Sequence, residues 1–494
     1  MAGVFFFEHA SYPTPPSCHM YDDAAKNYQE RRVAHWEEVA RRIHGKSAAV
    51  YYHRRLRQVY KFLVPPGLKV LELGCGDGNL LASLRPATGV GVDFSGEMVR
   101  LATRRHPELS FLQADVHDLP LSEQFDFIII SDLTNDLWDI ETVFKQIKKV
   151  AAPRSRVIIN AQSPLWELPL WMSKRIGLAR PTLLQNWLTA EDLVGLLGLA
   201  DFEVVRKWEE ILCPVALPLL APFLNRCIVK IWPFKKLALT NFIVARPLLP
   251  APFRVEPMVS VVVPARNESG NIPQIFARLP RMGRETELIF VEGHSSDDTY
   301  SAIEREIDAH PEQKSLLLRQ SGVGKGDAVR LGFTHAKGDI LMILDADLTV
   351  PPECLPRFYD VLHQGKGEFA NGVRLVYPME KEAMRFLNLM GNKFFSRAFS
   401  WLLGQPIKDT LCGTKTLWKS DYDRIAANRS YFGDFDPFGD FDLLFGAAKL
   451  NIKIREVPIR YMERSYGATN IRRWRHGWLL LKMVLFAVRR IKFV

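Results

Sequence analysis

Two separate series of short apolar runs, each alternating with helical patterns, constrain this chain more than any other feature of its sequence. The first series begins at Lys69 and reads LKVLEL, GVGVDF, FDFIIIS and RVIINA, and TNFIVARP near residue 240 reads as its closing strand. The second series begins at Met258 and reads MVSVVVPA, ELIFVEG and DILMILDAD. This rhythm is typical of α/β sheets built from strand–helix–strand units. We therefore expect two α/β domains in succession.

The break between the two series falls in the proline-punctuated stretch PLLPAPFRVEP, residues 247–257. A chain of 494 residues is too long for one hydrophobic core, which agrees with a domain boundary there. We predict a first domain over residues 1–250, a second over 251–475 and a C-terminal helix over 476–494. The six cysteines show no CxxC pair and no metal-ligand spacing, so a reducing compartment fits best.

In the first series, the glycine-rich turn GCGDG, residues 74–78, joins a strand to a helical pattern. Glycines let the backbone approach a ligand, and the following helix N-terminus presents unpaired N–H groups. Asp93 ends the next strand, roughly 20 residues further on, where a carboxylate can accept hydrogen bonds from both hydroxyls of a ribose. A dinucleotide site would use similar parts. The surroundings favour another cofactor, because Glu72 precedes the turn, the glycines lack the third-glycine placement of GxGxxG, and Asp115 follows the third strand.

These motifs resemble the class I methyltransferases that depend on S-adenosyl-L-methionine (SAM). The resemblance implies a Rossmann-like sheet, with Asp93 on the ribose, Asp115 on the adenine amine and Val116 beside the base; solvation of a loop is the alternative for Asp115. The implied cofactor-binding residues are Glu72, Gly74, Gly76, Asp93, Asp115 and Val116. Residues that the family places near the methyl acceptor are Ser131, Asp132 and Asn135. Tyr51, Tyr52 and His53 either cover the pocket, deprotonate a hydroxyl or pack in the core.

In the second series, Asp345 and Asp347 follow the apolar strand ILMIL. At a strand end the backbone can turn so that both carboxylates reach one divalent cation. Oxygen ligands suit Mg²⁺ or Mn²⁺, and a nucleotide diphosphate supplies the remaining ligands. A DxD by itself also fits a solvated strand end, so the neighbouring motifs decide.

Those neighbouring motifs are VSVVVPARNES, VEGHSSDDT, GKGDA, LDADLTV, DTLCGTK and EVPIRYMERSYGATN. Their order and spacing resemble family 2 glycosyltransferases of the GT-A fold, and most of all the dolichyl-phosphate mannose synthase and polyprenyl-phosphate glycosyltransferase branch. The resemblance implies a nucleotide-sugar pocket lined by Pro264, Ala265, Asn267, Glu268, Glu292, Lys325 and Asp345. It implies contacts to diphosphate or acceptor phosphate by Arg374, Asp409, Lys415 and Arg464. It assigns the metal to Asp345 and Asp347.

Asp440 and Asp442 resemble the acidic position near the sugar, so we count them with Asp345 and Asp347 as candidate catalytic residues. A hydroxyl acceptor would need one of them as a general base, whereas a phosphate acceptor needs none. Gly293 stands in place of the second acid of the usual DDGS segment, which leaves the nucleotide open. Asn470 stands where relatives usually carry a lysine.

The net charge of +10 fits nucleic acid, anionic lipid or phosphorylated substrates. Its clustering around the apolar stretch Trp478–Val488 resembles an interfacial amphipathic helix, and the alternative is a helix packed on the protein or in a dimer interface. No apolar run reaches the roughly 18 residues of a spanning helix. We expect the proline-interrupted segment 211–224 to pack on the core rather than contact a membrane.

The leading hypothesis is a bifunctional enzyme, cytoplasmic and peripheral at the inner face of the cytoplasmic membrane. It transfers a methyl group from SAM, and it transfers a sugar, with inversion and with Mg²⁺ or Mn²⁺, from a nucleotide-sugar to a polyprenyl phosphate. No nucleic acid partner is expected. One alternative is transfer to a saccharide hydroxyl in surface polysaccharide synthesis. Another is a first domain that binds SAM without turnover and regulates or scaffolds the transferase.

Overall fold

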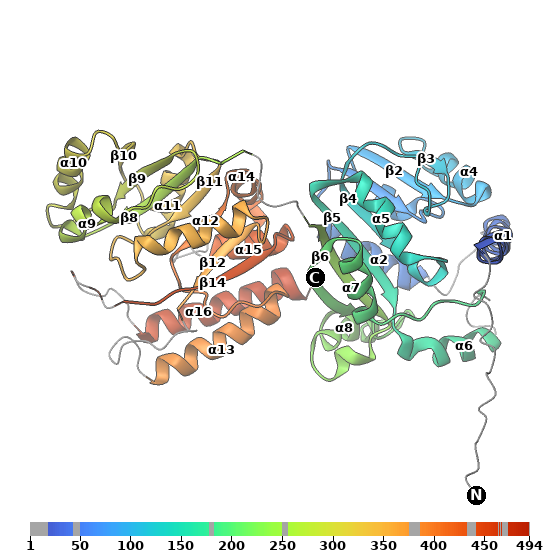
Figure 1. Cartoon of the computed structure of the whole chain (residues 1–494). Coiled ribbons are helices and arrows are strands. Elements are labelled where there is room, and N and C mark those ends of the chain that lie inside the picture. Colours follow the sequence, from blue (N-terminus) through green and yellow to red (C-terminus); the bar gives the residue numbers. More distant parts are fainter. Residues whose placement is uncertain are drawn as a thin grey trace, which may run out of the picture.

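The computed structural model describes residues 18–42, 50–176, 182–248, 255–374, 386–431, 441–462, 464, 466 and 473–493. Two α/β units follow each other along the chain, each built on a mixed seven-stranded sheet (Figure 1). The fold class expected from the sequence is thereby confirmed. Residues 249–254, which contain the expected boundary, lie outside the described residues, so the boundary at residue 250 stays a prediction.

The first sheet has the strand order β3-β2-β1-β4-β5-β7-β6. Its strands are β1 (Lys69–Leu73), β2 (Thr88–Asp93), β3 (Ser110–Gln113), β4 (Phe125–Ser131), β5 (Ala151–Gln162), β6 (Phe202–Glu210) and β7 (Thr240–Pro247). The first five strands along the chain run parallel, and β7 lies antiparallel between β5 and β6. The expected closing strand therefore forms, but it lies inside the sheet. Because β1 to β5 are parallel, the loops that follow β1, β2, β3 and β4 meet at one edge.

Helices cover both faces of this sheet, because neighbouring strand residues such as Val70 and Leu71 point into cores on opposite sides. The helices are α1 (Cys18–Arg41), α2 (Val50–Leu63), α3 (Asn79–Ser83), α4 (Gly96–Arg105), α5 (Ile140–Val150), α6 (Glu167–Arg175), α7 (Ala190–Leu199) and α8 (Leu220–Arg226). Helix α7 starts at a capping box between Thr189 and Asp192, which satisfies two of its first backbone N–H groups.

The second sheet has the order β10-β9-β8-β11-β13-β12-β14. Its strands are β8 (Val259–Ala265), β9 (Thr286–Glu292), β10 (Ser315–Arg319), β11 (Ile340–Ile343), β12 (Phe369–Val373), β13 (Lys415–Trp418) and β14 (Ile454–Pro458). Strand β13 is antiparallel to both of its neighbours. Strands β8, β9 and β11 are parallel, so the residues that follow them share an edge.

Two long helices lie side by side along the lower side of this unit, α13 (Phe386–Leu403) and α16 (Arg473–Ala487) (Figure 1). The other helices are α9 (Ile272–Arg278), α10 (Thr299–Ala309), α11 (Lys325–His335), α12 (Leu355–His363), α14 (Lys419–Ala427) and α15 (Phe441–Lys449). Helix α16 buries Leu480, Met483 and Ala487 in the domain core, while Trp478 and Leu485 are exposed. Most of the apolar face expected to enter a membrane is therefore used within the protein. No helix among the described residues is long and apolar enough to cross a bilayer.

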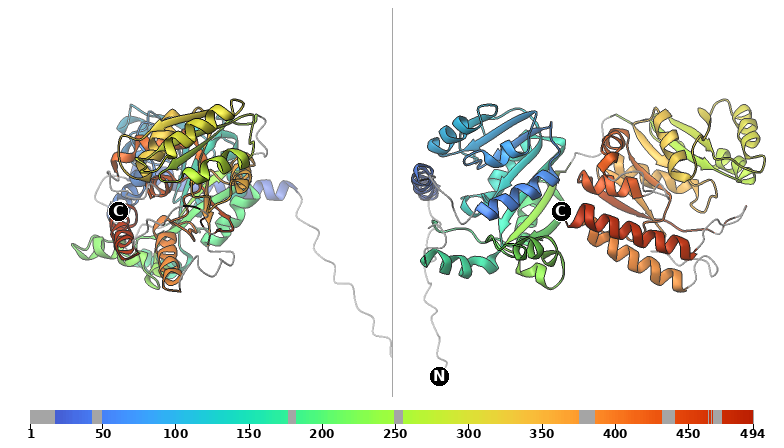
Figure 2. Two further views of the ribbon diagram at one scale, coloured as in Figure 1. Left: turned by 90° about the vertical axis from the view of Figure 1, so that its left-hand side faces the viewer. Right: turned by 180° about the vertical axis from the view of Figure 1, so that it is seen from behind.

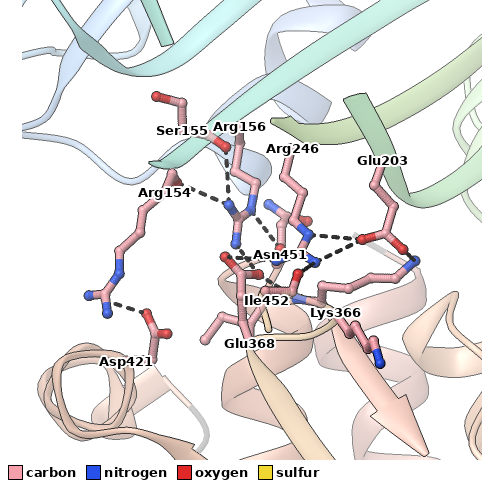
Figure 3. A network of polar contacts seen from close by, with 12 residues as sticks. Arg154, Ser155, Arg156, Glu203, Arg246, Lys366, Glu368, Asp421, Asn451 and Ile452 are labelled. Carbon is pink, nitrogen blue, oxygen red and sulfur yellow. Dashed lines mark hydrogen bonds and ion pairs between the residues drawn. The ribbon is translucent and has the colours of Figure 1, made fainter. Parts of the chain in front are cut away.

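The two units contact each other through a buried polar network (Figure 3). Arg156 of β5 donates from Nε to the carbonyl of Asn451, 2.7 Å away, and from Nη2 to Glu368 Oε2, also 2.7 Å away. Arg246 of β7 donates to the carbonyl of Gly365 at 2.8 Å. All three charged side chains are buried. Burial alone would raise the pKa of Glu368, but Arg156 and Arg246 outweigh it and hold that pKa below its usual range.

We predict that Glu368→Gln destabilises the contact between the units by about 3–5 kcal/mol, because it leaves a buried guanidinium without its counter-charge. The matched control is Glu353→Gln, which breaks an exposed pair to Arg278 of the same 2.7 Å length and should cost under about 1 kcal/mol. Since the pKa of Glu368 is lowered on folding, its contribution is present above about pH 4.3 and is lost as the pH falls further. Thermal melts of both variants at neutral pH check this, and equal losses would contradict it.

Candidate active sites

The glycine-rich turn after β1 is shaped for a close approach of backbone to a ligand. Gly74, Gly76 and Gly78 all have positive φ angles, which glycine adopts without strain. A side chain at Gly74 would collide with Leu133, whereas a Cβ at Gly76 would meet no atom within 4 Å. The turn at Gly76 therefore faces open space at the sheet edge.

Asp93 lies against this turn at the end of β2. Its Oδ2 accepts from the backbone N–H of Gly76 and its Oδ1 from that of Ser95, both at 2.9 Å. Burial raises the pKa of Asp93, and the two backbone donors oppose that rise. Glu72 is buried beneath the turn, where its Oε2 accepts from the N–H of Leu81 at 3.0 Å. The structure thus brings Glu72, Gly76 and Asp93 together around one loop.

Asp115 follows β3 at the same edge. Its Oδ1 accepts from the backbone and ring nitrogens of His117, at 3.0 and 2.7 Å, and its Oδ2 accepts from Gln29 of α1 at 2.7 Å. Desolvation, which would raise the pKa of Asp115, is outweighed by these donors, so that pKa is lowered. Val116 is buried in the core beside it. Gln29 carries no sequence signal, because its contact depends on how α1 folds back over the sheet.

A second polar cluster lies after β4. Asp132, at a left-handed φ of 53°, accepts hydrogen bonds from the Tyr52 hydroxyl at 2.9 and 3.0 Å and from Asn160 Nδ2 at 2.7 Å. Tyr60 donates to the Asn160 amide oxygen at 2.6 Å. Desolvation raises the pKa of Asp132 to about 7 in spite of these donors. Asn135, expected on the same side, instead donates to the carbonyl of Asn186 at 2.7 Å.

In the second unit, Asp345 and Asp347 follow β11, and each is paired with a basic side chain. Asp345 Oδ1 lies 2.5 Å from Nζ of Lys325, the first residue of α11. Asp347 Oδ2 accepts from Arg464 Nη2 at 2.6 Å, and its Oδ1 accepts from the Thr349 hydroxyl at 2.7 Å. Burial would raise the pKa of Asp345, but Lys325, followed by more distant cations, lowers it. Four residues expected at this site from the sequence therefore meet in one place.

The ends of β8 and β9 lie beside this pair. Arg464 Nη1 also lies 3.2 Å from Glu268 Oε1, so one guanidinium joins Glu268 to Asp347. Desolvation raises the pKa of Glu268 to about 6. Pro264 and Ala265 pair with Val291 and Glu292 across the two strands.

The loops after these strands also contact each other. Asn267 Oδ1 accepts from the N–H of Ser296 at 2.7 Å, and Glu292 Oε1 accepts from that of Ser295 at 2.6 Å. Both side chains thus hold the loop that follows β9 beside the ends of β8 and β9.

Arg374 and Asp409, both expected to meet phosphate, pair with each other. Arg374 donates from Nε and Nη2 to the two oxygens of Asp409 at 2.7 and 2.9 Å. Lys415 is buried, and its Nζ donates to the carbonyl of Cys412. Asp442, in the first turn of α15, accepts from Arg429 Nε at 2.7 Å. Asp440 and Asn470 lie outside the described residues.

Gly413 is a residue of this site that the sequence reasoning missed. A Cβ at this position would collide with Oδ2 of Asp345 and with Nζ of Lys325. The motif DTLCGTK contains this glycine, but nothing in the sequence shows that it lies against the acidic pair. Only the tertiary fold brings residue 413 to residue 345.

Asp345 and Asp347 supply only part of the ligands that a divalent cation needs. No group of three or more His, Cys, Asp or Glu side chains that could hold a metal occurs among the described residues. Mg²⁺ commonly uses one or two protein carboxylates and completes its shell with substrate phosphates and water. Asp345 and Asp347 match that donor set, and Lys325 and Arg464 would share their carboxylates with the cation.

The chain therefore combines two α/β units, each with acidic side chains gathered where its parallel strands end. Residues 65–188 match a model described as a methyltransferase domain, and residues 260–424 match the model of glycosyl transferase family 2. The chain thus carries a methyltransferase domain and a family 2 glycosyltransferase domain, as the sequence resemblances indicated.

Curated relatives match the second domain. The dolichol-phosphate mannosyltransferase of Saccharomyces cerevisiae is 39% identical over 112 residues, which cover 21% of this chain and 40% of the relative. The undecaprenyl-phosphate 4-deoxy-4-formamido-L-arabinose transferase of Klebsiella pneumoniae is 32% identical over 111 residues, 22% of this chain and 34% of the relative. The matched part thus spans only about a third to two fifths of the length of these relatives.

Among solved structures, glucosyl-3-phosphoglycerate synthase from Mycobacterium tuberculosis aligns with 48% of this chain and 80% of its own, at 18% identity and a TM-score of 0.35.

Proposed function

We propose that the second domain transfers a sugar from a nucleotide-sugar to a polyprenyl phosphate, and that the first domain transfers a methyl group from SAM. One observation carries the proposal for the second domain: Asp345 and Asp347 stand at the strand end with Lys325 and Arg464 beside them. A divalent cation on the carboxylates would neutralise charge on the leaving diphosphate. The two basic side chains supply further positive charge there.

Two lines support a phosphate acceptor over a hydroxyl. The relatives that match this domain are named for transfer to dolichol phosphate and undecaprenyl phosphate. A hydroxyl acceptor would need a general base, and the described candidate, Asp442, is engaged in an ion pair with Arg429. A phosphate acceptor needs no base, because it is largely deprotonated at neutral pH.

We propose that residues along one edge of the first sheet form the SAM site. Asp93 would hold the ribose, Asp115 and Val116 the adenine, and Gly76 the methionine part of the cofactor. Methyl transfer from a sulfonium is an in-line displacement, so holding the acceptor in line is the main requirement. The cluster of Asp132, Tyr52 and Asn160 is the candidate for that task.

Thermal melts with nucleotide sugars, with and without Mn²⁺, test the donor site, since a ligand of the folded state raises the melting temperature. We expect one nucleotide to raise it in a Mn²⁺-dependent way, and Asp345→Asn to remove the effect. A change in melting temperature that depends neither on Mn²⁺ nor on this substitution would mean that the nucleotide binds elsewhere. SAM binding without methyl transfer to any component of a cell extract would favour the regulatory alternative for the first domain.

The raised pKa of Asp132 makes a prediction that needs no methyl acceptor. A carboxyl whose pKa is about 7 when folded and about 3.9 when unfolded costs the folded state stability as the pH rises between these values. The melting temperature of Asp132→Asn, relative to wild type, should therefore rise between about pH 4 and pH 7 and level off at higher pH. The exposed Asp118→Asn is the control and should show no such trend. A pH-independent difference for Asp132→Asn would contradict an elevated pKa.

A further inference from the structure

Large apolar side chains of the methyltransferase domain are exposed together over α6, α8 and the segments around them. Their exposed fractions are large: Leu219 is 89% exposed and Trp232 is 70% exposed. The full set is Leu165, Leu168, Trp171, Met172, Ile176, Val215, Leu217, Leu219, Leu220, Phe223, Ile231, Trp232, Phe234 and Leu237. An apolar surface made of this many large side chains marks an interaction site rather than scattered exposure. We call it the α6–α8 surface.

This finding corrects the expectation that segment 211–224 packs on the core. Ile211, Cys213 and Ala221 are buried, but they anchor the segment so that Leu219 and Phe223 point outward. Pro214 and Pro218 precede α8, Pro222 lies in its first turn, and this short helix has one buried and one exposed side.

The charges on the α6–α8 surface are almost all positive. Residues 211–240 contain no Asp or Glu and three basic residues that are not buried, Arg226, Lys235 and Lys236, of which Lys235 lies 3.6 Å from Glu209. Lys230 of the same segment is buried. Helix α6 adds Lys174 and Arg175 against one acid, Glu167. Tryptophan, phenylalanine and leucine beside lysine and arginine suit the boundary between lipid headgroups and acyl chains, and the positive charges complement anionic headgroups.

One hydrogen bond joins the two parts of this surface, and another links it to the glycosyltransferase domain. Trp166 Nε1 donates to the carbonyl of Leu237 at 2.9 Å, which joins the start of α6 to the turn Phe234–Leu237. Trp401 Nε1 of α13 donates to the carbonyl of Lys230 at 3.0 Å. Figure 1 and both views in Figure 2 place α6, α8 and α13 along the same side of the molecule. Phe394 of α13 is also exposed.

We propose that the α6–α8 surface binds a bilayer that contains anionic lipid, so that the methyltransferase domain docks on the membrane through its own side chains. This goes beyond the proposed function, which concerns the chemistry of the two sites. The basic residues and the continuity with α13 favour a bilayer over a second copy of the chain. With both domains facing one membrane, a lipid-linked saccharide would be within reach of both.

Sedimentation of the full chain with vesicles tests the proposal. We expect binding to phosphatidylcholine vesicles that contain about a third phosphatidylglycerol, and weaker binding to pure phosphatidylcholine. Replacing Leu219, Trp232 and Phe234 together by Ser should weaken vesicle binding at least about 100-fold. The matched control replaces Val255, Leu316 and Val323, exposed apolar residues of the other domain, by Ser and should bind like wild type.

A charge variant keeps the proposal testable if the triple Ser variant folds poorly. Lys235→Gln with Lys236→Gln should lower binding to the anionic vesicles by about fivefold per lysine, without changing binding to pure phosphatidylcholine. Three results would overturn the proposal: no binding of wild type to anionic vesicles, equal losses in the control, or a loss of self-association instead of vesicle binding on ultracentrifugation. None of these measurements depends on either enzymatic activity.

A second, independent observation concerns a cavity of about 40 Å³ where the two domains meet. Arg206 of β6 lines it, is 8% exposed and lies with its guanidinium 4.7 Å from the Trp208 ring centre. Its Nε and Nη2 have no hydrogen-bond partner within the described part of the chain. Lys230 and Lys492 line the same cavity.

The acidic side chain that lines this cavity does not balance the positive charge of its basic side chains. Glu210 lines the cavity, but it already pairs with Lys230 and, at 3.2 Å, with Arg55. Burial, with Lys230 and Arg206 nearby, lowers the pKa of Lys492 to about 7. Burial lowers the pKa of Arg206 only to about 10, so its charge persists at neutral pH. A buried guanidinium with two N–H groups that lack acceptors costs several kcal/mol, which a bound anion would offset.

We infer that this cavity binds a phosphate-sized oxyanion between the domains. The cavity has about the volume of three water molecules, so it suits a free phosphate ion better than a larger phosphate ester. Inorganic phosphate should raise the melting temperature of wild type over chloride of equal ionic strength. Arg206→Gln should weaken phosphate binding at least about tenfold, while Arg284→Gln, at an exposed site, should not.

Asp345→Asn separates this cavity from the donor site. If phosphate acts at the domain junction, Asp345→Asn keeps the thermal shift and Arg206→Gln loses it. The opposite pattern, or no shift in wild type, would overturn the inference. Glycerol phosphate is the second probe, and an equal response to it would assign the cavity to phosphate esters as well.

Discussion

Gly413→Ala is expected to lower sugar transfer at least about 100-fold while leaving the fold intact. A methyl group at residue 413 would occupy the space of Asp345 Oδ2 and Lys325 Nζ, so the carboxylate that is proposed to hold the cation must move. A displacement of about 1 Å in a reacting group can cost a factor of about 100. Initial rates with a labelled nucleotide-sugar, alongside circular dichroism, measure both parts of the prediction.

Gly195→Ala is the matched control, because a Cβ there meets no atom within 4 Å. Residue 195 lies inside α7, where alanine is a better helix former than glycine, so this variant should be as active and at least as stable. Asp345→Asn should resemble Gly413→Ala in activity. Full activity of Gly413→Ala would mean that Asp345 has no role at its observed position.

Asp93→Asn is expected to weaken SAM binding by about two to four orders of magnitude. The carboxylate of Asp93 accepts from two backbone N–H groups, at Gly76 and Ser95, and is proposed to accept from the ribose as well. An asparagine has one oxygen, so its NH₂ group would face one of those N–H donors. Hydrogen bonds to charged groups are worth about 1.5–3 kcal/mol each, and the variant disturbs at least two of them.

Titration calorimetry with SAM measures this loss. Asp118→Asn removes an exposed carboxylate from the loop after β3 and should bind SAM like wild type. If Asp93→Asn also binds SAM normally, the ribose contact is wrong. Glu72→Gln would then be the next variant, because Glu72 supports the same turn from beneath.

The sequence predicted both folds and the convergence of the strand-end residues, for a physical reason. In parallel sheets the carboxyl ends of neighbouring strands meet at one edge, so Asp93 and Asp115, or Glu292 and Asp345, can be placed without knowing the helices. The exact position of β7 inside the first sheet did not follow, because antiparallel insertion depends on contacts far apart in the chain.

Contacts between side chains that lie far apart in the sequence could not be predicted. Gln29 reaches Asp115 only through the fold of α1, and Gly413 reaches Asp345 only through β13. The apolar stretch in α16 read as a membrane face, yet Leu480 and Met483 pack in the core. The segment around Leu219 read as core, yet it is exposed. An apolar pattern predicts that a surface will be covered, but it does not predict whether the protein itself or a partner covers it.

The most direct test of the central claim is a labelling experiment with two isotopes. Purified chain is incubated with membranes, Mn²⁺, a ¹⁴C-labelled nucleotide-sugar and SAM carrying a ³H-methyl group, and the products are partitioned between organic solvent and water. We predict ¹⁴C in an organic-soluble product that releases its sugar under mild acid, with its formation lost in Asp345→Asn, and ³H transfer that is lost in Asp93→Asn alone. ¹⁴C found only in water-soluble products would contradict the polyprenyl-phosphate acceptor, and label transfer unaffected by either substitution would contradict both sites.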